Sequence, residues 1–347
     1  MILFVANDAG PARYISYILE KLNPSSYICL ASHISSKVFD EFNIKYTKDD
    51  TDIAIKDIKL IFTGTSLGWC IDKKWLEIGK KREIRSISII EHWSLYKKRF
   101  EIDANRYIFP DLILVNDDLA KREAIEDGID KRLLRVVGNP VLENIVESSY
   151  NFRDKIRWKK RLKLLGSRVI TFISEEYKSD FPINSKEYIG FNEFKVIDDI
   201  LNNLDKKDLL LIKLHPEESR DKYIYLLKRG ANIKIIDKTD TQKLITFSDI
   251  LIGMGSILLL EASLIRGDVY SYRPNERIKF IGNRNGMTIP IKNRAMLKRV
   301  LNGKIKRGKN FKNPFFKTTD KILDILEEIL NENSSFNTGK TQFAKIT

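Results

Sequence analysis

The chain has few of the residues that define several common protein classes. Its 347 residues include only two cysteines, Cys29 and Cys70. Cys29 lies in an apolar run and Cys70 follows a glycine turn, so their spacing matches no metal or redox motif. A reduced compartment is the simplest setting for such a chain, and we expect a cytoplasmic location.

Long apolar runs are also missing. No stretch reaches the roughly 18 uninterrupted apolar residues that a membrane-spanning helix needs. The N-terminal MILFVAND is too short for a signal peptide and lacks a preceding basic region. Any contact with a membrane is therefore expected to be peripheral, at the inner membrane face.

The sequence lacks the motifs of several ligand classes. Neither G-x-G-x-x-G nor G-x-x-x-x-G-K-[ST] occurs, which argues against a dinucleotide-dependent dehydrogenase and a P-loop kinase. Zinc-finger spacing, a helix-turn-helix signature and an aromatic RNA motif are also missing. The one D-x-D string, residues 50–52, lies in a polar loop, where a solvated turn is favoured over a metal-binding pair. We expect no metal and no cofactor.

The charge balance is strongly basic. Lysine and arginine number 61 against 47 aspartates and glutamates, a net charge of +14. Such a balance favours nucleic acid, anionic lipid or phosphorylated substrates, and without a recognition motif nucleic acid is not favoured. An AT-rich coding bias would also explain the lysines. The basic helix 151–166 either lies on an anionic membrane or docks on protein with its lysines in water.

Three short apolar runs, 209–214, 233–236 and 250–252, have the length and Ile/Leu content of strands that are buried on both faces. Each is followed by a turn and a helical stretch, as in βαβ units. Two of these turns contain residues that can contact a ligand. They are His215-Pro216-Glu217 and Gly253–Ser256. Ligands of open α/β sheets bind outside the carboxyl ends of strands, so we expect a ligand there.

The second turn has the features of a phosphate site. Glycines 253 and 255 let a ligand approach the backbone, and Ser256 opens an apolar helical run. A helix N-terminus offers free N–H groups and a partial charge of roughly half a unit. Glu261, further along the helix, could reach a ribose hydroxyl. The alternative is that Ser256 serves only as an N-cap and that Glu261 forms an ion pair at the surface or between domains. Both interpretations stay open.

The N-terminal half opens with a strand, residues 2–6, and a turn containing Asn7, Asp8 and Gly10. Asp8 is either a general base or, with a slight preference, the cap of the following helix. A later strand, 59–64, ends in a turn rich in glycines and hydroxyls, a second potential ligand-facing turn.

Residues 86–90 form a strand that leads into Glu91-His92-Trp93. Glu91 or His92 at a strand end can take a proton from an acceptor hydroxyl. Trp93 offers a flat surface for a sugar ring, and the basic cluster 96–99 suits an anionic acceptor or a membrane. The alternative is that His92 satisfies a loop hydrogen bond while Trp93 packs beneath it; the functional interpretation is favoured.

Further polar groups follow the strands of the C-terminal half. Ser174 and Glu175 end the strand 168–174 and either touch hydroxyl groups of a ligand or stay solvated. Lys213 precedes His215 and adds charge at the phosphate. In the N-terminal half, Asn139 before Pro140 is pushed to an extended conformation, which indicates a fixed, ligand-facing turn.

Two segments carry a family resemblance. KLHP (213–216) and SDILIGMGSILLLEA (248–262) resemble the nucleotide-binding half of GT-B glycosyltransferases of bacterial surface carbohydrates. The HP motif is similar to that of sialyl-, Kdo- and polyglycerolphosphate transferases. VVGNPVLE (136–143) resembles UDP-sugar 2-epimerases and lipid-A disaccharide synthase. The motifs are short and diagnose the fold better than the substrate.

The resemblance implies an α/β fold with two Rossmann-like domains that face each other across a cleft. It also implies metal-independent transfer, in which His215 and the helix end at 255–256 hold the donor phosphate and Glu261 the ribose. Glu91 or His92 would be the base. The expected segments are an acceptor domain (1–150), a basic linker helix (151–166), a nucleotide-donor domain (167–315), a helix that returns to the first domain (316–331) and a disordered tail (332–347).

The function expected from these features is sugar transfer from a nucleotide-activated donor to a bacterial surface glycan or lipid-linked acceptor. The alternatives are a nucleotide-sugar 2-epimerase or hydrolase, a CDP-activated polyol-phosphate transferase, and a nucleic-acid- or glycan-binding scaffold without activity. The donor base, the sugar, the acceptor, the stereochemistry and the oligomeric state cannot be read from the sequence.

Overall fold

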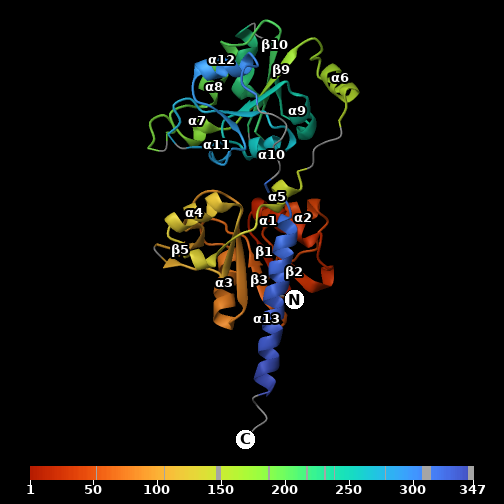
Figure 1. Cartoon of the computed structure of the whole chain (residues 1–347), viewed down its shortest axis with the longest axis vertical. Coiled ribbons are helices and arrows are strands. Elements are labelled where there is room, and N and C mark those ends of the chain that lie inside the picture. Colours follow the sequence, from red (N-terminus) through yellow and green to blue (C-terminus); the bar gives the residue numbers. More distant parts are fainter. Residues whose placement is uncertain are drawn as a thin grey trace. The chain divides into compact units, whose positions relative to one another are not determined.

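The computed structural model describes residues 1–51, 53–104, 106–145, 150–186, 188–215, 218–229, 232–237, 239–277, 279–306 and 314–342. The chain divides into two compact units. Unit 1 comprises Met1–Asn144 and Asn313–Thr347, and unit 2 comprises Ile145–Lys312. The C-terminal segment therefore belongs with the N-terminal unit (Figure 1).

Within its described residues, unit 1 contains a six-stranded parallel sheet in the order β2-β1-β3-β4-β7-β8. Most of the strand residues are buried, because helices cover both faces of the sheet. The expected α/β class is confirmed for this half of the chain. The strands are β1 (Ile2–Ala6), β2 (Tyr27–Ala31), β3 (Leu60–Thr63), β4 (Arg85–Ile90), β7 (Leu112–Val115) and β8 (Leu134–Val136).

Alternate residues of β1 point to opposite faces of this sheet. Phe4 packs with residues of α1, α2 and α13, whereas Leu3 and Val5 pack with Trp75 of α3. This period of two is the alternation of side chains along a strand. A short antiparallel pair, β5 (Glu101–Asp103) and β6 (Arg106–Tyr107), lies outside the sheet. The α-helices of unit 1 are α1 (Ala9–Leu19), α2 (His33–Glu41), α3 (Ile71–Arg82), α4 (Asp118–Glu126), α5 (Pro140–Glu143) and α13 (Thr318–Gln342).

Helix α13 is anchored to unit 1 at its first turn. The carboxylate of Glu143 accepts the backbone N–H groups of Thr318 and Thr319, both at 2.8 Å. Ile322 then enters the core beside α1. The helix extends to Gln342, and residues 343–347 lie outside the described part of the chain. The disorder expected for the tail, residues 332–347, stays a prediction.

Unit 2 repeats this architecture. Its described residues form a six-stranded parallel sheet in the order β11-β10-β9-β12-β13-β14. The three strands expected at 209–214, 233–236 and 250–252 are all present, which confirms the α/β class for this half as well. The strands are β9 (Arg168–Ile173), β10 (Asp208–Lys213), β11 (Ile233–Ile236), β12 (Ile250–Gly253), β13 (Val269–Tyr272) and β14 (Ile289–Ile291).

The sequence pattern missed part of this unit. β14 contains Pro290, which a sheet tolerates at its edge, where one side of a strand makes no ladder hydrogen bonds. The helical stretch expected after β10 is present, as the 3₁₀-helix η5 (Arg220–Arg229). The α-helices are α6 (Phe152–Arg161), α7 (Tyr177–Asp180), α8 (Glu193–Leu201), α9 (Thr241–Phe247), α10 (Ile257–Ile265), α11 (Ile281–Arg284) and α12 (Arg294–Leu301).

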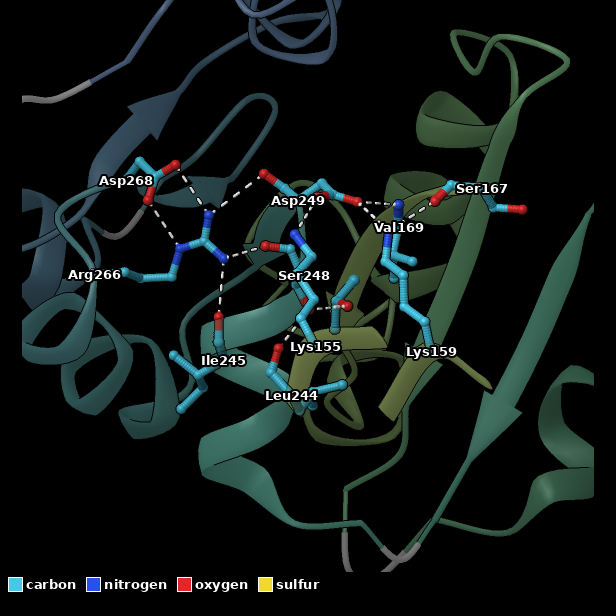
Figure 2. A network of polar contacts seen from close by, with 11 residues as sticks. Lys155, Lys159, Ser167, Val169, Leu244, Ile245, Ser248, Asp249, Arg266 and Asp268 are labelled. Carbon is cyan, nitrogen blue, oxygen red and sulfur yellow. Dashed lines mark hydrogen bonds and ion pairs between the residues drawn. The ribbon is translucent and has the colours of Figure 1, made fainter. Parts of the chain in front are cut away.

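The basic helix α6 is part of unit 2. Its Trp158 is 3% exposed and packs against Phe247 of α9. Lys155 and Lys159 reach the carboxylate of Asp249, at 2.7 and 3.0 Å (Figure 2). These contacts support docking on protein for one face of the helix. No helix in the described residues is both long and apolar enough to cross a membrane.

We expect Asp249→Ala to lower the free energy of unfolding by about 2 kcal/mol. The substitution removes the hydrogen-bond acceptor of the Val169 backbone N–H and the ion-pair partner of Lys155 and Lys159. Besides both lysines, the carboxylate accepts the Val169 backbone N–H at 2.8 Å (Figure 2). Burial alone would raise the pKa of Asp249, but the hydrogen bonds from Lys155, Val169 and Lys159 lower it.

Urea denaturation at neutral pH measures this effect. The control is Asp205→Ala, which removes a carboxylate of the same unit that is 76% exposed. Equal unfolding midpoints for the two variants would show that the Asp249 network does not hold α6 in place.

Candidate functional site

Three turns of unit 2 meet at one edge of its sheet. β10 and β12 both pair in parallel with β9, so the carboxyl ends of the three strands are adjacent. Because neighbouring strands lie about 4.8 Å apart, the turns fall within roughly 10 Å of one another. They carry His215 after β10, Ser174 and Glu175 after β9, and Gly255 and Ser256 after β12.

The turn after β12 is shaped by close packing around Gly255. A Cβ atom placed on this glycine would lie 2.2 Å from the Tyr177 hydroxyl and 2.8 Å from an Arg273 nitrogen. The backbone of Gly255 is therefore approached closely, as expected, but by the side chains of Tyr177 and Arg273. Ser256 caps α10 by accepting the N–H of Leu258 at 3.2 Å, as the N-cap interpretation expected.

Glu175 binds this turn with its carboxylate. Its Oε2 accepts the backbone N–H of Gly255 at 2.8 Å. The residue as a whole is partly exposed, but its carboxyl group is enclosed, and this burial raises the pKa of Glu175 to about 7 against the opposing effects of the Gly255 amide and Arg273. Glu175 is thus bonded within the protein, and its contact with donor hydroxyls stays a prediction. An anionic group already sits at the predicted phosphate position.

Arg273 is the site residue of unit 2 that the sequence interpretation missed. It follows β13, is 5% exposed and donates to the Tyr177 hydroxyl at 3.0 Å. It also pairs with Glu276 at 2.5 Å, and its guanidinium lies over the ring of Phe191. Its position just after a strand, at the same edge as the other turns, was the available signal.

His215 lies exposed at the end of β10. Its backbone N–H donates to Glu218 Oε2 at 2.7 Å, which fixes the turn. Lys213, two residues earlier, donates to the carbonyl of Leu214 at 2.6 Å, and burial lowers the pKa of Lys213. Pro216 and Glu217, both predicted ligand residues, lie outside the described residues.

Ser174 does not face a ligand as predicted. It is 1% exposed, and its hydroxyl bonds to Glu218 Oε1 at 2.8 Å and to the Tyr223 hydroxyl at 2.6 Å. Its role is to hold Glu218, which in turn holds His215. Glu261 lies on α10 and is partly buried, and its proposed contact with a ribose stays a prediction.

In unit 1, the end of β4 presents Glu91 and His92. His92 Nε2 lies 3.3 Å from Glu91 Oε1, and the two side chains are 44% and 9% exposed. A Cβ on Gly10 would lie 3.0 Å from Glu91 Oε1, so this glycine makes room for the carboxylate. The other oxygen of Glu91, Oε2, is buried without a hydrogen-bond partner among the described residues.

A second buried carboxyl group, Asp72, lies on the first turn of α3. It is 1% exposed; its Oδ2 accepts the N–H of Ser66 at 3.1 Å, and its Oδ1 is buried without a partner in the described structure. Burial raises the pKa of Asp72 to about 6, and the charges of Asp8 and Glu91 add to the rise. The sequence interpretation missed Asp72, because nothing in its neighbourhood distinguishes it from an ordinary first-turn aspartate.

At this edge of unit 1, one expectation is wrong and a second is narrowed. Trp93 is 7% exposed and its indole N–H donates to Asp117 at 2.8 Å, so it packs beneath the loop and offers no open face to a sugar. Arg99 of the basic cluster is also buried, and donates to the carbonyls of Thr65 and Ser94 at 3.0 and 3.1 Å. Lys98 of the same cluster is exposed, so contact of the cluster with an anionic acceptor or a membrane stays a prediction.

The favoured capping role of Asp8 is also wrong. Asp8 holds the N-cap position of α1, but its side chain makes no capping hydrogen bond. Instead its Oδ1 accepts the amide of Asn7 at 2.8 Å. Asn139 does have the extended backbone expected before proline, and its side chain caps α5 by accepting the N–H of Val141 at 3.0 Å.

No group of three or more His, Cys, Asp or Glu side chains in the described residues is arranged to hold a metal. Of the D-x-D string, Asp50 pairs with Lys74 at 2.5 Å, and Asp52 lies outside the described residues. A cavity of about 490 Å³ in unit 2 opens at the opposite edge of the sheet, beside Arg168 and Asp249. Both of these residues are already paired, Arg168 with Asp208 and Asp249 with Lys155, so the cavity marks no site.

Comparison with known proteins identifies the fold alone. No protein-family model matches the chain, and no curated protein matches its sequence. The solved structure of a UDP-GlcNAc 2-epimerase from Methanocaldococcus jannaschii is similar with a TM-score of 0.64 and 15% identity, over 94% of this chain and 100% of that one. The UDP-GlcNAc 2-epimerase from Neisseria meningitidis, bound to UDP-GlcNAc, gives 0.60 and 14%, over 94% and 99%.

A third similar structure is HepE from Anabaena in complex with UDP and glucose. It has a TM-score of 0.60 and 12% identity, over 98% of this chain and 99% of that one. These likenesses extend over both units, and the two parallel six-stranded sheets match. The chain therefore has the GT-B-type fold.

Proposed function

We propose that the protein transfers a sugar from a nucleotide-activated donor to a glycan or lipid-linked acceptor, with unit 2 binding the nucleotide and unit 1 supplying the base. The observation that supports this best is the turn after β12. There the backbone amide of Gly255 holds a carboxylate at 2.8 Å, beside the capped helix α10. Backbone amides at a helix N-terminus bind phosphate for the same reason that they bind this carboxylate.

In this proposal a phosphate oxygen of the donor replaces Glu175 at the Gly255 amide. Protonation of Glu175 eases its departure, because a neutral carboxyl is held less tightly by the amide and does not repel the phosphate. His215, exposed on the neighbouring turn, then supplies a charge-assisted hydrogen bond. Glu91, paired with His92, takes the proton of the acceptor hydroxyl.

A second function, epimerisation or hydrolysis of a nucleotide sugar, is favoured by two observations. Two of the similar structures are UDP-GlcNAc 2-epimerases. Unit 1 also presents two buried carboxyl groups, Glu91 and Asp72, whereas transfer requires a single base. Pairs of titratable groups with different environments are typical of acid–base chemistry on one substrate.

Product analysis separates the two functions. The protein is incubated with UDP-glucose or UDP-GlcNAc, with and without a bacterial glycolipid extract, and the products are followed by NMR. Sugar transfer predicts release of UDP that depends on the extract. A 2-epimer or a free sugar formed without the extract would establish the second function instead. A thermal-shift screen with UDP, CMP, CDP and GDP tests the shared premise, since ligands of the native state raise its stability.

We expect His215→Ala to weaken UDP binding by about 1.5–3 kcal/mol, or roughly 10- to 150-fold, as for loss of a hydrogen bond to a charged group. Titration calorimetry measures it. His33→Ala is the control, because His33 is equally exposed but lies in unit 1. Equal UDP affinity in the two variants would remove His215 from the phosphate site.

A further inference from the structure

Two carboxyl oxygens of unit 1 are buried without a hydrogen-bond partner among the described residues: Glu91 Oε2 and Asp72 Oδ1. Both side chains are at least nine-tenths buried, with Glu91 9% and Asp72 1% exposed. Leaving such an atom unsatisfied destabilises the folded state, and more so when the atom is charged. The two oxygens are among nine such polar atoms in the described residues, and as carboxyl oxygens they leave hydrogen bonds for a ligand to supply.

The two groups belong to one electrostatic cluster at the carboxyl ends of β1, β3 and β4. Asp72 follows the turn after β3 and senses the charges of Asp8 and Glu91. Arg99 faces the same carboxylates, but it donates to the carbonyls of Thr65 and Ser94. The arginine therefore offsets part of the negative charge without satisfying the two free oxygens.

Glycines bring these carboxyl groups close to α1. A Cβ on Gly64 would lie 2.6 Å from Pro11 and 3.3 Å from Asp72 Oδ2, and a Cβ on Gly10 would lie 3.0 Å from Glu91 Oε1. The positions of Gly10 and Gly64 therefore both need a residue without a side chain. These carboxyl groups are not a metal site, since no group of three or more ligating side chains in the described chain is arranged for one.

We propose that Asp72, together with Glu91, binds a neutral hydroxyl-bearing group of the substrate, and that Asp72 excludes an anionic group from this position. Hydroxyl groups donate the hydrogen bonds that the two oxygens lack. An anion at the same place would face three carboxyl groups, whose charge Arg99 offsets only in part. The inference rests on the proposed function, and it assigns a neutral sugar, not an acidic one, to unit 1.

The experiment measures the melting temperature of the whole chain with glucose or N-acetylglucosamine, against glucuronate and glucose 6-phosphate as anionic counterparts and glucosamine as a cationic one. We expect the neutral sugars to raise the melting temperature of the wild type and the anionic ones to leave it unchanged. Asp72→Asn and Glu91→Gln should each lose most of that rise. Asp103→Asn, which changes an exposed carboxylate of the same unit, should keep it.

A structural role would give a different result. Asn at 72 can still accept the Ser66 N–H, so without ligand we expect Asp72→Asn to melt no lower than the wild type. Four results would each overturn the proposal. Two concern the variants: a lower melting temperature for both Asp72→Asn and Glu91→Gln without ligand, or a rise with neutral sugars that is unchanged in Asp72→Asn. The other two concern the wild type: equal stabilisation by anionic sugars, or stabilisation by glucosamine alone. UDP is tested on the same samples: UDP binding without any sugar effect contradicts only this inference, whereas failure to bind any nucleotide contradicts the proposed function.

Discussion

We expect Glu91→Gln to lower turnover of the nucleotide sugar by roughly 10²- to 10⁴-fold, the contribution typical of a positioned general base. Glutamine keeps the shape of the side chain but cannot take a proton. UDP affinity should stay within twofold, because the nucleotide site proposed here lies in unit 2 and the change is in unit 1. Steady-state kinetics give the loss of turnover, and calorimetry with UDP gives the affinity.

The matched control is Glu83→Gln, which alters a glutamate at the end of α3 in the same unit. His92→Ala should also lower turnover, by less than Glu91→Gln, since His92 orients the carboxylate from 3.3 Å but is 44% exposed. If Glu91→Gln and His92→Ala both retain full activity, the base lies elsewhere. Unchanged or raised thermal stability of Glu91→Gln is expected, because the variant removes a charge whose Oε2 is buried without a described partner.

Most strands could be predicted because their signal is local. The β9, β10 and β12 segments are short apolar runs bounded by polar turns, and burial on both faces of a parallel sheet selects such runs. The sequence also showed that reactive side chains follow these strands. Strand order then brings the turns to one edge, a consequence of topology that composition alone does not contain.

The missed residues depend on contacts between distant segments. Glu175 could be seen as a ligand-facing residue, but its partner is the amide of Gly255, 80 positions further along the chain. Arg273 acts through Tyr177, 96 positions away. Asp72 resembles any aspartate in a first helical turn until its burial is known. Local patterns predicted where the chemistry lies, but not which partners each side chain has.

The same limit applies to helix ends. Helix α13 begins where Thr318 meets Gly138, whose φ of +115° lies in the region that favours glycine. A Cβ on Gly138 would lie 2.1 Å from the Thr318 hydroxyl oxygen. No pattern within residues 318–331 reveals that contact, although the apolar period of the helix was visible.

Glu175→Gln is expected to raise stability at pH 8 by about 3 kcal/mol relative to the wild type, with little change at pH 4.5 or below. Burial raises the pKa of Glu175 from 4.5 to about 7, so the folded state holds the proton more tightly than the unfolded state. The contribution of this proton to the stability of the folded state is fully present below the pKa of Glu175 in the unfolded state. It is lost as the pH rises through the pKa of Glu175 in the folded state. Glutamine has no such loss.

Urea denaturation at both pH values, with Glu176→Gln as the neighbouring control, measures this difference. The same variant should bind UDP about tenfold more tightly at pH 8, because a charge that repels the phosphate at the Gly255 amide is gone. If Glu175→Gln shows the same pH dependence of stability as the wild type, its carboxyl group is not enclosed as described. If its stability changes as expected but UDP affinity does not, the Gly255 amide is an internal cap for Glu175 and the donor phosphate binds elsewhere.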